Sequence, residues 1–308
     1  MSIINFKGRN IISIRDFSKT DLLYIINTAR KLEKEYDSNL LNKHVLASLF
    51  FEPSTRTRLS FSSAMNRFGG RVIGFDNPDS TSLKKGESLR DTIKTVEGYS
   101  DIIVMRHPVD GAARFVSEIS KIPIINAGDG INQHPTQTLL DLYTIKKSFG
   151  KLDELSIGFV GDLKYGRTVH SLAHALSHFN AKMRFVSPPQ LKMPEDHLEE
   201  LKEKKIKFTE EDDLSKISKK VDILYMTRIQ KERFPDPVEY QKLKGCYKID
   251  KDFLSKTKPG MKIMHPLPRV DEIHPNLDEE EQSIYFEQAH NGVIVRMALL
   301  ALLLGELQ

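Results

Sequence analysis

The stretch VLASLFFEPSTRTRLSFSSAMNRFGGRVIGF, residues 45–75, decides the fold class of this chain. An apolar run at 45–51 has the composition of a buried strand, the pattern at 55–68 is helical and stops at two glycines, and 71–75 is again a short strand. A strand, a helix and a second strand within about 30 residues form the unit that joins parallel neighbours in a sheet. The sequence therefore predicts an α/β protein with mostly parallel sheets.

The same alternation continues along the chain. A helix is expected from about Leu89 to Tyr99 and another over 135–150. The further strand candidates are 101–105, 122–127, 156–162, 181–188, 221–227 and 261–266. We predict two domains, each with a mostly parallel sheet flanked by helices, joined by inter-domain helices. One comprises residues 1–150 with a C-terminal helix at about 290–308, and the other comprises residues 151–289.

The composition excludes several classes of protein. Of the 308 residues, 39% are hydrophobic and 29% charged, which supports packed cores. The net charge of +4 is spread over interleaved lysines and acids, which argues against a nucleic-acid-binding stripe. The longest apolar run, 297–304, is too short to cross a membrane and is expected to be a buried C-terminal helix. We expect a protein that binds neither nucleic acid nor membrane.

The cysteine content and the N-terminus bear on the compartment. Cys246 is the only cysteine, which excludes an internal disulfide and fits a reducing environment. We expect it to be a small buried or incidental residue. The N-terminus has no apolar core of signal-peptide length. Both features predict a cytoplasmic location.

Polar side chains directly follow six of the predicted strands. Ligands of open parallel sheets bind beyond the carboxyl ends of the strands and beside helix N-termini, so these positions are candidates for one site. Arginine occurs at five of the six ends, which favours an anion-binding cleft between the two domains. In chain order the candidates are Ser54, Thr55, Arg56 and Thr57; Arg106 and His107; His134 and Gln137; Arg167; Arg228 and Gln230; and Pro266, Leu267 and Arg269.

The segment Ser54–Thr57 lies at the start of the helix in the opening stretch. Backbone N–H groups and the dipole at a helix start attract an anion, hydroxyls add donors, and Arg56 adds a bidentate guanidinium. The alternative is that Ser54 simply caps the helix. A cap needs one hydroxyl, so the remaining donors favour a phosphate-type site.

Three other segments leave alternatives open. GDLKYGRT at 161–168 has the spacing of a phosphate-binding ATPase loop, but it has only two glycines and has arginine where that loop needs lysine. His134 is either an ordinary histidine or, from its place between a strand end and a Pro-started helix, a functional one. Lys84 and Lys85 are either exposed lysines or part of a loop that folds over an anion. No HExxH or paired-cysteine pattern indicates a metal.

Together these motifs resemble the catalytic chains of the aspartate carbamoyltransferase family, within the aspartate/ornithine carbamoyltransferase superfamily. The resemblance runs from the first strand through the C-terminal helix. It implies transfer of the carbamoyl group of carbamoyl phosphate to the α-amino group of L-aspartate, in pyrimidine (UMP) biosynthesis. We assign no cofactor and no metal. The matching segments are FFEPSTRTRLSF, SLKKGES, IVMRHP, NAGDGINQHPTQTLLDLYTI, GDLKYGRTVHSL, DILYMTRIQKERF and MHPLPRVDEI.

The resemblance also implies a role for each candidate residue. The phosphate is held by Ser54, Thr55, Arg56 and Thr57. Arg106 bridges the phosphate and the carbonyl oxygen, and His134 polarises that carbonyl. The carbamoyl NH2 is held by Gln137 and by backbone carbonyls near Pro266 and Leu267. The aspartate carboxylates are bound by Lys85, Arg167, Arg228 and Gln230. Ser82 and Lys85 enter from a neighbouring subunit of a homotrimer, with Lys84 as the alternative to Lys85. A nucleotide-binding, zinc-containing regulatory chain is a further implied partner.

The charges suit this chemistry. The two substrates bring about four negative charges at neutral pH. Holding two anions together is catalysis by proximity, and Thr57, Arg106 and His134 can stabilise the oxyanion that forms when the amine attacks. The alternatives are an ornithine carbamoyltransferase, whose family has a Cys in an HCLP-type motif where this chain has HPLP, a phosphate-loop ATPase, and a non-catalytic anion-binding module. Positive charge comes from Arg56, Lys85, Arg106, Arg167 and Arg228.

Overall fold

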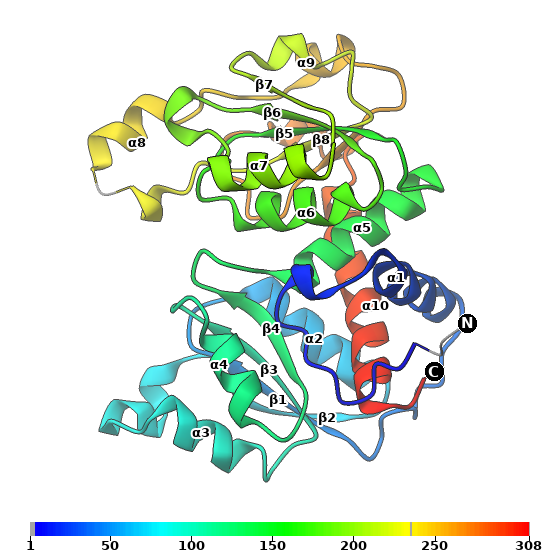
Figure 1. The fold of residues 1–308 in the computed structure, drawn as a ribbon, viewed down its shortest axis with the longest axis vertical. Coiled ribbons are helices and arrows are strands. Elements are labelled where there is room, and N and C mark those ends of the chain that lie inside the picture. Colours follow the sequence, from blue (N-terminus) through cyan, green and yellow to red (C-terminus); the bar gives the residue numbers. More distant parts are fainter. Residues whose placement is uncertain (1–3, 235, 308) are drawn as a thin grey trace. The chain divides into compact units, whose positions relative to one another are not determined.

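A computed structural model describes residues 4–234 and 236–307. The chain divides into two compact units. Unit 1 is the chain up to Tyr143 together with the chain from His290 onward, and unit 2 is Thr144–Ala289. Each unit contains one parallel sheet flanked by helices, which confirms the predicted fold class (Figure 1). The division falls within helix α5 (Pro135–Phe149), and the domain limits predicted from the sequence stay a prediction.

The sheet of unit 1 has the strand order β2-β1-β3-β4, and all neighbours are parallel. Its strands are β1 (Val45–Phe50), β2 (Arg71–Phe75), β3 (Ile102–His107) and β4 (Ile124–Asp129). The register places Phe50 opposite Arg106 and Met105 opposite Asn126. The carboxyl ends of β1, β3 and β4 therefore lie side by side at one edge of this sheet.

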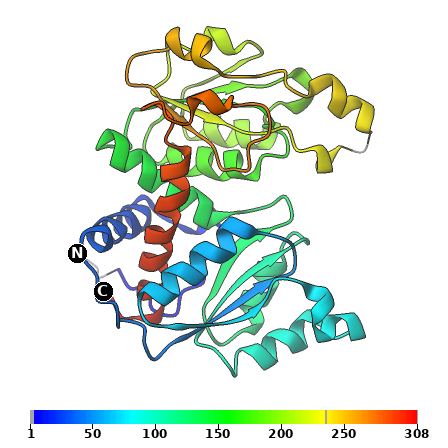
Figure 2. The same ribbon diagram turned by 180° about the vertical axis from the view of Figure 1, so that it is seen from behind.

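Helices cover both faces of this sheet. α3 (Leu89–Val96) and α4 (Ala112–Ile119) pack on one face, where Ile93 and Val116 share a core with Leu49 and Met105. α2 (Thr55–Arg67) lies on the opposite face, as Figures 1 and 2 show together. α1 (Lys19–Lys34) was not predicted, although Ser18 and Asp21 form a capping box at its start.

The C-terminal helix α10 (Tyr285–Leu304) begins five residues before the predicted start. Its apolar segment from Met297 to Leu303 is buried, as the sequence indicated. Within residues 4–234 and 236–307, no helix combines the length and the apolar character that crossing a bilayer requires.

The sheet of unit 2 has the order β7-β6-β5-β8-β9, again with parallel neighbours. α6 (Arg167–Ser177) and α7 (Glu195–Glu203) lie on one of its faces (Figure 1), and α8 (Pro237–Leu243) and α9 (Lys251–Ser255) are shorter. The strand order reverses between β5 and β8, the place where open sheets of this kind bind ligands. The strands are β5 (Ser156–Val160), β6 (Lys182–Val186), β7 (Phe208–Glu211), β8 (Ile223–Met226) and β9 (Lys262–Met264).

Candidate active site

The junction between β1 and α2 carries the hydroxyl and guanidinium groups of the opening stretch. Ser54 occupies the N-cap position of α2 with an extended backbone, but its side chain makes no capping hydrogen bond. Ser18 and Ser88, the N-caps of α1 and α3, both accept such a bond. The interpretation of Ser54 as a simple cap is therefore wrong. Thr57 is buried in the first turn, whereas Arg56 is exposed.

Arg106 lies beside this junction at the end of β3. Its Nε donates to Oε1 of Glu52 across 2.6 Å, and the N–H of Phe51 donates to the Arg106 carbonyl across 2.9 Å. These contacts fix the half-buried guanidinium of Arg106 beside Glu52, which lies two residues before the N-cap of α2. At the next position of β3, burial lowers the pKa of His107, although the charges of Glu52 and Asp129 oppose this. His107 is therefore a neutral side chain at the edge of a cationic site.

The loop after β4 is organised by Asp129, which sequence reasoning missed. This carboxylate is fully buried and accepts from Nδ2 of Asn126 at 2.8 Å and from the N–H of Gly111 at 2.9 Å. It also accepts from the N–H of Gln133 at 3.2 Å. Asp129 thus holds the backbone that leads into His134, which is buried immediately before α5.

Gln137 lies in the first turn of α5, and its N–H donates to the carbonyl of His134 across 3.0 Å. Its side-chain Nε2 donates to Oδ1 of Asp141 across 2.9 Å. Unit 1 therefore brings the predicted residues at the ends of β1, β3 and β4 to one edge of its sheet. Ser82, Lys84 and Lys85 form an exposed 3-10 turn after β2, and their predicted contact with a neighbouring subunit stays a prediction.

In unit 2, the carboxyl group of Asp162 accepts backbone hydrogen bonds in the loop from β5 to α6. Oδ1 of Asp162 accepts from the N–H of Tyr165 at 2.9 Å, and its other oxygen accepts from the N–H of Gln230 at 3.5 Å. Burial raises the pKa of this carboxyl, although these N–H groups and the charge of Arg228 oppose the rise. A phosphate-binding loop needs such backbone N–H groups for its ligand, so the spacing of GDLKYGRT does not make an ATPase loop.

Asp162 also organises the predicted residues around this loop. Nε2 of Gln230 donates to the carbonyl of Tyr165 across 3.2 Å, and the N–H of Asp162 donates to Oγ1 of Thr227 across 3.1 Å. Arg167 is the first residue of α6. Arg167, Arg228 and Gln230 are thereby gathered at the carboxyl ends of β5 and β8. Sequence reasoning missed Asp162, although Gly-Asp follows β5 directly and also ends β4.

The loop after β9 is held by a buried histidine. Nδ1 of His265 accepts from the N–H of Leu267 at 2.8 Å, so the ring donates through Nε2 to Oε1 of Glu272 at 2.7 Å. Burial alone would raise the pKa of Glu272, but the hydrogen bond that it accepts from His265 and those from backbone N–H groups lower it overall. Leu267 adopts a left-handed backbone with φ of 55°, which sets the direction of its carbonyl group.

Arg269 has a structural role at the start of the loop that follows β9. It pairs with Asp278, with Nη2 2.6 Å from Oδ2, and donates to the Tyr285 hydroxyl across 3.0 Å. The anion-binding interpretation therefore does not extend to this residue.

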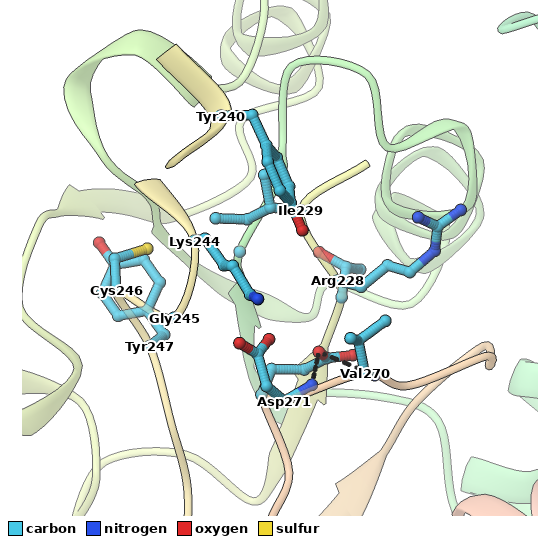
Figure 3. A pocket seen from close by; sticks show the side chains of 12 residues that line it. Arg228, Ile229, Tyr240, Lys244, Gly245, Cys246, Tyr247, Val270 and Asp271 are labelled. Atoms are coloured by element: carbon cyan, nitrogen blue, oxygen red, sulfur yellow. Dashed lines mark hydrogen bonds between the residues drawn. The ribbon is translucent and has the colours of Figure 1, made fainter. Parts of the chain in front are cut away.

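A small pocket of unit 2 is lined by Arg228, Lys244, Cys246 and Asp271 among other residues (Figure 3). In Figure 3 the Lys244 amine points toward the Asp271 carboxylate, while the Arg228 side chain extends away from both. Cys246 is exposed, so of the two expected possibilities it is not a buried residue, and its being an incidental one stays a prediction. In the part of the chain that the structure describes, no group of three or more His, Cys, Asp or Glu side chains is arranged to hold a metal ion.

Comparisons with known proteins identify the family to which both halves of the chain belong. The carbamoyl-P binding domain of aspartate/ornithine carbamoyltransferases matches residues 9–147, and the Asp/Orn binding domain matches residues 153–303. The chain belongs to the aspartate/ornithine carbamoyltransferase family.

Within this family, the chain is similar to aspartate carbamoyltransferases. The aspartate carbamoyltransferase catalytic subunit of Thermococcus kodakarensis is 58% identical over 99% of both chains. The solved catalytic subunit of M. jannaschii aspartate transcarbamoylase is 55% identical, with a TM-score of 0.89 over 95% of this chain and 96% of that one. The Trypanosoma cruzi enzyme in complex with carbamoyl phosphate and aspartate is 40% identical, with a TM-score of 0.91 over 97% and 98%. The resemblance found in the sequence is confirmed.

Proposed function

We propose that this chain transfers the carbamoyl group of carbamoyl phosphate to the α-amino group of L-aspartate, giving N-carbamoyl-L-aspartate and phosphate for pyrimidine biosynthesis. The observation that carries the proposal is the donor-rich start of α2, where the Ser54 hydroxyl is not used as a helix cap. The likeness to the T. cruzi enzyme solved with both substrates supports the same assignment.

Unit 1 binds carbamoyl phosphate. The first turn of α2 receives the phosphate through the side chains of Thr55, Arg56 and Thr57, together with Ser54 and the helix dipole. Arg106, held in place by Glu52, reaches both the phosphate and the carbonyl oxygen. His134 donates to the same carbonyl oxygen.

Unit 2 binds L-aspartate. Arg167 and Arg228 pair with its carboxylates, and Gln230 adds a hydrogen bond. A cationic amino acid such as ornithine places a second positive charge beside two guanidinium groups, which disfavours it. The backbone carbonyls near Pro266 and Leu267 face the carbamoyl NH2, and the His265–Glu272 pair holds their loop.

The reaction follows from the charges that these residues supply. The neutral amine of aspartate attacks the carbamoyl carbon and forms a C–N bond, while negative charge develops on the carbonyl oxygen. Thr57, Arg106 and His134 stabilise that oxygen, which lowers the barrier. The C–O bond to phosphate then breaks, and the departing phosphate accepts the amine proton. No enzyme nucleophile takes part, so no covalent intermediate forms.

The assembly belongs to the same proposal. Ser82 and Lys85 complete the site of a neighbouring subunit in a homotrimer, with Lys84 as the alternative to Lys85. Residues 1–150 with 290–308 form the carbamoyl phosphate domain, and 151–289 form the aspartate domain. The enzyme acts in the cytoplasm, and a nucleotide-binding, zinc-containing regulatory chain is a candidate partner.

An assay of carbamoyl transfer tests the proposal. The purified chain should convert carbamoyl phosphate and L-aspartate to N-carbamoyl-L-aspartate, measured colorimetrically, and should leave L-ornithine unchanged. Activity with ornithine alone would reject the substrate. Hydrolysis of ATP without carbamoyl transfer would reject the reaction class.

A further inference from the structure

A buried arginine connects the two helices whose N-termini form the carbamoyl phosphate site. Arg296 lies in α10 and is only 3% exposed. Its Nη1 donates to Oγ of Ser60 on α2 across 2.9 Å, and Nη2 lies 3.5 Å from Oγ1 of Thr136 on α5. Its guanidinium also lies over the ring of Phe61, 5.0 Å from the ring centre.

The fold leaves space for the Arg296 guanidinium, and the charge of an acidic side chain stabilises its protonated form. A Cβ atom at Gly292, one turn earlier in α10, would overlap the Arg296 guanidinium. Burial lowers the pKa of Arg296 to about 10, and the charge of Asp141 opposes the shift. Arg296 therefore stays protonated at neutral pH, and the fully buried Asp141 is the acidic side chain whose charge acts on it.

An ionised carboxylate can only accept hydrogen bonds. Asp141 lies 2.9 Å from the end of the Gln137 side chain, so the end of that amide that faces it must be the NH2 group. The Gln137 oxygen is then turned away from Asp141. A protonated Asp141 could donate instead, and the amide could turn over.

We propose that Arg296 and Asp141 are positioning residues that fix the Gln137 amide with its oxygen toward the acyl phosphate. An oxygen at this place accepts from an amino group and offers nothing to a methyl group. The arrangement therefore selects carbamoyl phosphate over acetyl phosphate, which differs only by CH3 in place of NH2. This inference rests on the proposed function, because it takes the carbamoyl group to lie beside Gln137.

Asp141→Asn tests the inference with little change in shape. An asparagine can donate as well as accept, so the Gln137 amide is no longer held in one orientation. The discrimination is the ratio of Ki for acetyl phosphate, as a competitor of carbamoyl phosphate, to KM for carbamoyl phosphate. We expect Asp141→Asn to lower this ratio by roughly 10- to 100-fold. Inhibition by inorganic phosphate, which lacks the acyl group, should change by less than about 3-fold.

Controls separate positioning from general damage. Asp222→Asn alters an aspartate of unit 2 that accepts from the N–H of Ser156 at 2.9 Å, and it should leave the discrimination ratio unchanged. Equal losses of affinity for carbamoyl phosphate, acetyl phosphate and inorganic phosphate in Asp141→Asn would overturn the inference. A discrimination ratio in Asp141→Asn equal to that of the wild type would also overturn the inference, and it would leave the proposed function intact if the wild type transfers the carbamoyl group. A wild type without carbamoyl transfer would instead reject the proposed function.

A second variant applies if Asp141→Asn fails to fold. Gln137→Glu changes the half-buried partner and keeps Asp141 in place. Beside an ionised Asp141 the new carboxyl stays protonated above its ordinary pKa, donates to Asp141 and presents its C=O oxygen to the ligand. Discrimination should therefore be retained at about pH 6 and fall toward about pH 9, as the new group ionises and is repelled. A ratio that does not vary with pH would contradict the arrangement.

Discussion

The β1–α2 and β5–α6 junctions occupy equivalent places in their sheets but differ in what meets the start of the helix. Both follow a parallel strand; the N-cap of α2 is Ser54, whose side chain makes no capping bond, and the N-cap of α6 is Gly166, which has no side chain to make one. At β1–α2 the neighbouring carboxylate, Glu52, pairs with Arg106. At β5–α6 the carboxylate of Asp162 accepts from the backbone of the loop itself. In the proposed function the first junction receives an incoming anion, whereas in the second junction a carboxyl group of the chain itself accepts from the loop.

This difference explains why spacing misleads at one junction and not at the other. GDLKYGRT has the glycine spacing of a phosphate loop, yet Asp162 takes its donors. PSTRT has no such spacing, yet its hydroxyls and Arg56 lie at a helix start with no acid within the turn. A helix start can bind phosphate only if its N–H groups do not already donate to an acceptor of the chain itself.

The largest expected effect is at the first junction. Arg56→Ala should lower kcat/KM for carbamoyl phosphate by about 1,000-fold or more, because it removes a charged donor from the phosphate. Thermal unfolding should be nearly unchanged, since Arg56 is exposed. Arg58→Ala is the matched control: Arg58 pairs with Asp76 across 2.8 Å, and its loss should change activity by less than about 3-fold. Near-normal turnover in Arg56→Ala would remove the phosphate role.

Inorganic phosphate should distinguish the junctions directly. Phosphate at about 100 times its Kd should stabilise the wild type by about 2.7 kcal/mol, which differential scanning calorimetry detects as a raised Tm. The shift should persist in Asp162→Asn and disappear in Arg56→Ala. A shift that requires Asp162 and survives the loss of Arg56 would place the phosphate at the wrong junction.

The sequence predicted the elements whose signal is apolar. β1, β3, β4 and β5 are buried runs, and each lies where the pattern placed it. β7 was missed because its sequence, FTEE, is polar at the edge of the sheet, where little burial shapes the composition. Edge strands of this kind are defined by pairing with a neighbour, which periodicity does not reveal.

The sequence indicated the cationic residues of the candidate site but not the acidic residues that hold its loops and side chains. Arginines and hydroxyls at strand ends indicated anion binding, so acidic residues in the same loops attracted no role. Asp129, Asp141 and Asp162 nevertheless hold the loops and side chains in place through buried hydrogen bonds. Only the three-dimensional structure shows that these carboxylates face backbone N–H or amide groups rather than the ligand. The exposure of Cys246 was also beyond the sequence.

The stability of Asp162→Asn as a function of pH should test the role of this carboxyl group at the β5–α6 junction. In acid Asp162 is a neutral carboxyl whose O–H oxygen can still accept from a backbone N–H, whereas the NH2 group of an asparagine cannot accept, so the variant should lose about 2 kcal/mol of stability in acid. The folded-state pKa of Asp162 is raised above 3.8, so its favourable contribution is complete below 3.8 and is lost as pH rises through the folded pKa. The stability gap between wild type and variant should therefore narrow over that window, as measured by urea unfolding.

Asp222→Asn provides a control of opposite sign for the same experiment. The pKa of Asp222 is lowered overall: burial raises it, but Lys258 and the N–H of Ser156 lower it by more. Its contribution is therefore complete above 3.8 and is lost as pH falls through the folded pKa. For Asp222→Asn the difference in free energy of unfolding between wild type and variant should widen as pH rises. The same behaviour in Asp162→Asn would show that the folded-state pKa of Asp162 is not raised by burial.

The smallest effect separates the two uses of a serine at a helix start. Ser18→Ala removes a side chain that accepts from the N–H of Asp21 at 3.1 Å, so it should cost about 1 kcal/mol of stability and leave activity unchanged. Ser54→Ala removes no capping bond, so its stability should change by less than about 0.5 kcal/mol while KM for carbamoyl phosphate rises by about 10-fold. Urea unfolding and steady-state kinetics on both variants give the four values. If Ser54→Ala lost as much stability as Ser18→Ala and kept its KM for carbamoyl phosphate, the Ser54 hydroxyl would be a helix cap. The evidence that the β1–α2 junction binds phosphate and the β5–α6 junction does not would then come from Arg56→Ala alone.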